Sequence, residues 1–172
     1  MSETAVSLQP SDSSPDRSAH LMLTPEPRAR LRIDQQLQAA GWLIYDNGQQ
    51  NLGAGPGVVV REFQTSTGPA DYALFVDRKL VGVVEAKPEG SLLGEVAEQT
   101  VRYLSSSTKF VQRAAEQLPF GDEANGDEVR FCDWRDPQPR SRNVFSFHRP
   151  ETLRGWLADL YPLRARLQHL PF

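Results

Sequence analysis

The sequence predicts a mixed α/β domain in which a small mixed sheet is sandwiched between helices. Helical and β-type segments follow one another in the order helix, strand, hairpin, helix, strand, helix. The segment 80–87, LVGVVEAK, is apolar on both faces before Glu85, which is typical of a central strand covered from both sides. A chain of 172 residues can also bury a core of its own. We therefore expect one compact domain built around this strand.

Each element carries a local signal. Within 28–42, Leu31, Leu37 and Ala40 recur at roughly helical spacing, and Gly41 provides a stop. The remaining segments are assigned as a turn over 46–57, a strand over 58–63, a loop over 65–69, a helix over 92–104, a turn-rich connection over 117–128, a strand over 129–134 and, after a loop rich in Pro and Arg, a helix from about Pro150.

Composition limits the classes of partner. A formal net charge of −3 argues against a protein held to nucleic acid by bulk positive charge. From residue 130 onward, however, eight arginines accompany four acidic residues, so a local basic surface and an ordinary solvated surface both remain open. The single cysteine, Cys132, excludes an intramolecular disulfide and a cysteine-rich zinc site, which fits a cytoplasmic location. No run of about 18 apolar residues predicts a membrane span.

The first 20 residues differ in composition from the rest of the chain. They are rich in Ser, Pro and Asp and lack the basic start and apolar core of a secretion signal. This composition predicts a disordered tail over residues 1–20, followed by a folded domain over residues 21–172.

The hairpin that follows the first strand places three charges at one of its ends. Asp71 opens its first strand, and Glu85 and Lys87 close its second. If the reversal is centred on Arg78, Asp71 lies directly opposite Glu85, and Lys87 shares the face of Glu85. A reversal centred between two residues puts Asp71 on the other face unless a bulge corrects the register.

These residue types suit phosphodiester hydrolysis. Two neighbouring carboxylates repel each other and persist when a cation lies between them or when they share a proton. Mg²⁺ prefers oxygen ligands, commonly one or two carboxylates with waters and phosphate oxygens. A nearby ammonium group can orient water and neutralise charge that develops on phosphorus. The simpler interpretation is that the strand ends are charged because they meet solvent.

The same residues resemble a known family. Pro69-Ala70-Asp71 followed by Glu85-Ala86-Lys87 resembles the PD-(D/E)xK nuclease superfamily. Further along, Gln99-Thr100-Val101-Arg102-Tyr103 resembles the QxxxY motif of its RecB-like and type I restriction branches. Three more segments look like the amino-terminal region of the type I restriction enzyme R subunit (HsdR), namely 33–42, 124–134 and 144–153. The resemblance runs from about Leu21 to the last residue.

The resemblance implies a restriction-endonuclease-like fold and an Mg²⁺-dependent endonuclease that cleaves double-stranded DNA. It assigns Asp71 and Glu85 as metal ligands, and Lys87 as the residue that acts on the attacking water. Gln99 and Tyr103 would support the site or contact the DNA backbone. Glu62 and Glu26 are candidates for an additional acid in the site. The simpler interpretation is that both are ordinary exposed glutamates.

The implied partners are the modification (M) and specificity (S) subunits of a type I complex. The chain contains no G-x-x-x-x-G-K-[ST] loop, so ATP is expected only in a full-length subunit that carries the translocase. The chain would then be an excised or truncated nuclease domain or a stand-alone relative. Two other functions remain open: a catalytically idle DNA-docking or subunit-assembly module with the nuclease fold, and a RecB-like nuclease outside restriction.

Overall fold

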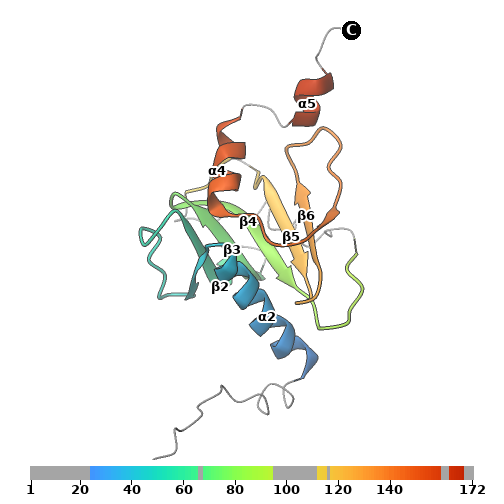
Figure 1. The fold of residues 1–172 in the computed structure, drawn as a ribbon. Coiled ribbons are helices and arrows are strands. Elements are labelled where there is room, and N and C mark those ends of the chain that lie inside the picture. The colour runs from blue at the N-terminus through green and yellow to red at the C-terminus, as the bar shows by residue number, and fades with distance from the viewer. Residues whose placement is uncertain (1–23, 66–67, 95–111, 116, 160–162, 169–172) are drawn as a thin grey trace, which may run out of the picture.

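A computed structural model describes residues 24–65, 68–94, 112–115, 117–159 and 163–168, and these residues form a seven-stranded sheet with three helices (Figure 1). The elements are α2 (Pro25–Ala39), β1 (Leu43–Asp46), β2 (Gly57–Thr65), β3 (Gly68–Val76), β4 (Lys79–Ala86), β5 (Phe120–Ala124), β6 (Val129–Asp133), β7 (Arg142–Val144), α4 (Pro150–Ala158) and α5 (Leu163–Gln168). None of the helices in these residues is long and apolar enough to cross a membrane.

The sheet is mixed, as the sequence predicts. Its strands lie side by side in chain order from β1 to β7. The pairs β1–β2 and β4–β5 are parallel, and the other pairs are antiparallel. The strand β4 is the fourth of the seven and is buried from Leu80 to Val84, so it is the central strand that its apolar sequence predicts.

The helix α2 packs on the sheet through one row of side chains. Ala29, Ile33 and Leu37 are four residues apart and fully buried, because this spacing returns to the same side of a helix. The helix ends at Ala39, close to the predicted Gly41. Leu31, one of the residues whose spacing predicts this helix, falls outside this row and is 42% exposed.

The apolar residues form one cluster on each side of the sheet. One cluster joins α2 and α4 to the sheet and includes Ile33, Phe120 and Leu153. The other lies on the opposite face and includes Val60 and Phe75. Figure 1 shows α2 and α4 in front of the same face. The sheet is therefore lined by apolar side chains on both of its faces.

The helix expected over 92–104 lies for the most part outside the described residues. Its described beginning, 92–94, is not helical. The spacing of the expected helix would put Leu92 on one inward face with Val96, Gln99 and Tyr103. Leu92 is 98% exposed, so this expectation is wrong for Leu92.

Three strands do not follow from local sequence signals. The segment that holds β5 is expected to be a turn-rich connection, and the segment that holds β7 is expected to be a loop. Most of β1, residues 43–45, falls between the expected helix and the expected turn and has no assignment. The sequence of β5, FGDEA, contains a glycine and two acidic residues, which are poor strand formers. It becomes a strand because β4 and β6 pair with it from both sides, and all five of its residues are buried.

The close approach of β4 to β5 gives a stability prediction. A Cβ atom at Gly82 would lie 2.7 Å from the backbone oxygen of Phe120, so one strand would have to move. We expect Gly82→Ala to lower the free energy of unfolding by about 1–3 kcal/mol, measured by urea denaturation. Gly155→Ala is the matched control, since nothing lies within 4 Å of that position in α4. That variant should gain about 0.5–1 kcal/mol. Equal effects of the two substitutions would contradict this account of the β4–β5 contact.

Candidate active site

A bulge in the β3–β4 hairpin sets the position of Asp71. The turn residues Asp77 and Arg78 both have positive φ, so the reversal is centred between them, and Val76 pairs with Lys79. The register then shifts between Leu74 and Phe75, which gives β4 one extra residue.

The shifted register brings the carboxylate pair together. Beyond the bulge, Tyr72 pairs with Val84, and continuing this register by one residue places Asp71 opposite Glu85. A reversal centred between Asp77 and Arg78 would by itself put the two carboxylates on opposite faces of the sheet. The bulge returns them to the same face.

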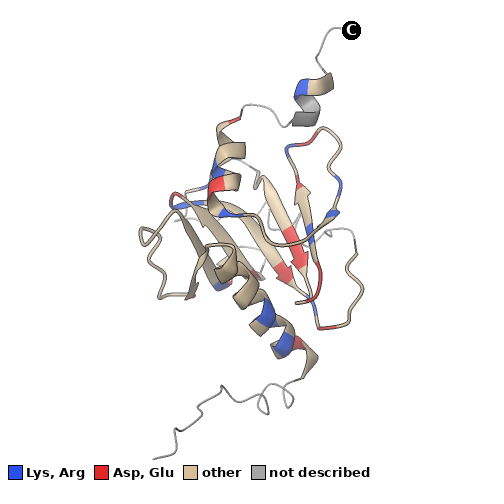
Figure 2. Cartoon of the chain, viewed as in Figure 1, with Lys and Arg blue, Asp and Glu red and all other residues tan. Residues whose placement is uncertain are grey.

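The charged side chains are held by short contacts at the end of β4. The Asp71 carboxylate accepts a hydrogen bond through Oδ2 from the backbone N–H of Ala86, with 2.9 Å between the heavy atoms. The Lys87 Nζ lies 3.4 Å from Glu85 Oε1. Figure 2 shows acidic residues at the ends of β4 and β5, beside α2 with its arginines. The structure therefore brings Asp71, Glu85 and Lys87 together, while their catalytic roles stay predictions.

Both carboxylates of the pair are destabilised in their charged forms. Burial raises the pKa of Asp71, and the charge of Glu62 raises it further, against the hydrogen bond from Ala86 and the charge of Arg30. Burial also raises the pKa of Glu85, and the neighbouring charge of Asp71 adds to this effect. Each carboxylate is thus less stable in its charged form than in water, which a bound cation would reverse.

Arg30 on α2 is part of this site and was not anticipated from the sequence. Its guanidinium donates hydrogen bonds to Asp71 and Glu62, and it lies 3.7 Å from Glu26. Arg30 therefore links Asp71 to both candidate additional acids, Glu62 and Glu26. Glu62 is exposed and has a positive φ of 49°, which departs from the regular β conformation within β2. A contact between residues 41 positions apart has no local sequence signal.

Glu123 on β5 is the second residue that sequence reasoning missed. It pairs in register with Glu85 on the adjacent parallel strand, so the two side chains emerge on the same face. It is only 4% exposed, and its Oε1 lies 3.9 Å from Lys87 Nζ. The segment was expected to be a connection, and a glutamate in a connection gives no reason to place it in a site.

Gln99 and Tyr103, the residues of the QxxxY motif, lie outside the described residues. Their expected support of the site therefore stays a prediction from the sequence.

The donor set fits a hard divalent cation such as Mg²⁺. Asp71 and Glu85 offer oxygen ligands, and such a cation commonly takes one or two carboxylates and completes its shell with water and phosphate oxygens. Within the part of the chain that the structure describes, no three His, Cys, Asp or Glu side chains form a ready metal-binding group.

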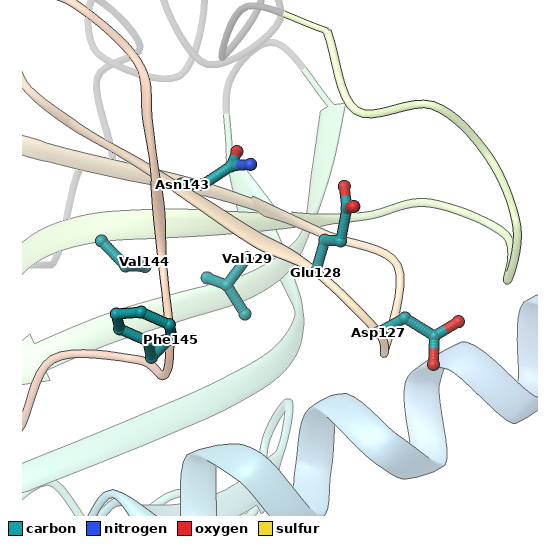
Figure 3. A pocket seen from close by; sticks show the side chains of 6 residues that line it. All are labelled: Asp127, Glu128, Val129, Asn143, Val144 and Phe145. Atoms are coloured by element: carbon teal, nitrogen blue, oxygen red, sulfur yellow. The ribbon is translucent and has the colours of Figure 1, made fainter.

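A separate hollow lies beside the turn between β5 and β6. It has a volume of about 290 Å³ (Figure 3). Its lining residues are Asp127, Glu128, Val129, Asn143, Val144 and Phe145. Neither the carboxylate pair nor Lys87 lines it, so this hollow and the charged site are different places.

Comparison with known proteins identifies the fold and the family. The mixed sheet and the helices packed on it form a restriction-endonuclease-like α/β fold. The chain belongs to the family of the second domain of the type I restriction enzyme EcoKI endonuclease subunit, which residues 42–128 match. No curated protein matches the chain significantly.

Among solved structures, the chain is similar to a fragment described as an HsdR subunit of a type I restriction enzyme from Vibrio vulnificus YJ016. The two share 21% sequence identity with a TM-score of 0.57, which shows a common fold. The match covers 80% of this chain and 26% of that chain, so this chain spans about a quarter of its length.

The raised pKa of Glu85 gives a prediction about pH. Because the folded protein holds this proton more tightly than the unfolded chain, the contribution of Glu85 to stability is present at low pH and is lost as pH rises through its folded pKa. Glutamine mimics the protonated form. We expect Glu85→Gln to be more stable than the parent at pH 7, with a difference that shrinks toward about pH 4, where a free glutamate titrates.

Thermal unfolding between pH 4 and pH 8 measures this difference. Glu128→Gln, which removes an exposed carboxylate, is the matched control. A Glu85→Gln variant that is less stable than the parent at pH 7 would contradict the prediction.

Proposed function

We propose that this chain is the endonuclease domain of a type I restriction enzyme R subunit and that it hydrolyses DNA phosphodiesters with Mg²⁺. The membership of the EcoKI endonuclease subunit family supports the restriction reading. The observation that carries the chemistry is the pair Asp71 and Glu85 with Lys87 beside it, at the end of the central strand.

Each residue of the site has a distinct proposed role. Asp71 and Glu85 hold the cation, and the N–H of Ala86 fixes the orientation of the Asp71 carboxylate. When bound, Mg²⁺ would supply a Lewis acid that polarises the phosphate and lowers the pKa of a bound water. The Lys87 ammonium orients the attacking water and offsets the negative charge that develops on the phosphoryl oxygens.

The substrate and partners follow from the same proposal. Double-stranded DNA would be bound through its phosphates, so binding should weaken steeply with salt. Gln99 and Tyr103 would support the site or contact the DNA backbone. The M and S subunits of a cytoplasmic type I complex would select the DNA, and a translocase elsewhere in a full-length R subunit would use the ATP.

A plasmid assay tests the activity. We expect the chain to nick supercoiled plasmid slowly in the presence of Mg²⁺ and to stop when EDTA is added. Glu85→Ala should lower the nicking rate by at least about 100-fold, because it removes one of the two carboxylates proposed to hold the cation. Glu128→Ala is the matched control, since it removes an exposed glutamate that does not contact the site, and it should nick at the parent rate.

Two outcomes would contradict the proposal. Equal nicking by the parent and Glu85→Ala would place the activity at another site. A parent that binds DNA in a salt-sensitive manner but never nicks it would indicate the idle docking module instead.

A further inference from the structure

Glu123 is a buried carboxylate that forms an ion pair with Lys87. Its exposed fraction is 4%, and its Oε2 is buried with no hydrogen-bond partner among the residues that the structure describes. Its other oxygen, Oε1, lies 3.9 Å from Lys87 Nζ. Burying a carboxylate with an unsatisfied oxygen costs free energy. Stability therefore does not account for this residue, which indicates another role at its position.

The strand β5 contacts both the backbone and the side chain of Lys87. The backbone N–H of Lys87 donates to the backbone oxygen of Ala124 at 2.7 Å, which carries the β4–β5 pairing one residue past the end of β4. The Glu123 side chain then meets the ammonium group of the same lysine, whose Nζ also lies 3.4 Å from Glu85 Oε1. The ammonium group thus lies between a carboxylate from β4 and a carboxylate from β5.

We propose that Glu123 is a positioning residue that holds the Lys87 ammonium group at the Asp71–Glu85 site. This inference rests on the function proposed above and adds a residue from a third strand to it. Glu123 acts through Lys87, and it does not complete a metal-ligand set, because no three metal-ligating side chains of the described ranges lie close enough together. The adjacent acid Asp122 emerges on the opposite face of β5 and takes no part.

Kinetics separate a positioning role from metal or DNA binding. We expect Glu123→Gln, which keeps the size of the side chain and removes its charge, to lower kcat for plasmid nicking by about 10- to 100-fold. The KM for DNA and the Mg²⁺ concentration for half-maximal rate should not change. Glu123→Asp keeps the charge and should retain more of the parent kcat than Glu123→Gln. Glu128→Gln is the matched control and should keep the parent values.

The contrary outcomes are equally specific. A Glu123→Gln variant with the parent kcat, or a Glu123→Asp variant as slow as Glu123→Gln, would overturn the proposal. A shift in the half-saturating Mg²⁺ concentration would make Glu123 a metal ligand and would also overturn it. Thermal unfolding of each variant should show a folded protein, because removing a buried charge does not weaken the core.

A second measurement does not depend on cleavage. The chain contains three lysines, Lys79, Lys87 and Lys109, so the NMR spectrum of protein labelled with ε-¹³C-lysine has three signals. Lys87→Arg identifies the Lys87 signal by its loss. We expect Glu123→Gln to move this signal and Glu128→Gln to leave it in place. The two claims therefore fail separately. A parent that does not cleave DNA would overturn the proposed function, and a Lys87 signal that does not move in Glu123→Gln would overturn the contact with Glu123.

Discussion

The structure depends on the one-residue bulge that shifts the register of β3 against β4 between Leu74 and Phe75. The tight turn at Asp77 and Arg78 fixes one register, and the bulge replaces it by the register that brings Asp71 to Glu85. Because side chains alternate along a strand, a slip of one residue would move each side chain to the opposite face. The hairpin thus decides which charges meet at the end of the sheet.

The meeting of these charges opposes folding and prepares the site for a ligand. Burial raises the pKa of both Asp71 and Glu85, and a neighbouring carboxylate raises each pKa further, Glu62 for Asp71 and Asp71 for Glu85. Arg30 on α2 and Lys87 at the end of β4 offset part of this cost through their ion pairs with Asp71 and Glu85. The proposed cation would complete the neutralisation of these carboxylates, which the fold already places close together.

The sequence predicts the parts of the fold that local patterns encode. The mixed α/β class, the helix that ends at Ala39 and the central strand β4 follow from periodicity and apolar runs. The strand β5 could not be predicted, because its pairing with β4 and β6 makes it a strand against its local preference.

The site follows the same division. The spacing of Asp71, Glu85 and Lys87 is visible in the sequence, whereas Arg30 and Glu123 enter through contacts made only in the folded chain. The sequence leaves two registers of the hairpin open, one of which needs the bulge, and only the folded structure selects between them.

The measurement that tests the central claim is X-ray diffraction from crystals soaked in Mn²⁺, whose anomalous signal locates the ion. We predict a peak between the carboxylates of Asp71 and Glu85. A fully occupied peak elsewhere, with these carboxylates bare, would contradict the account.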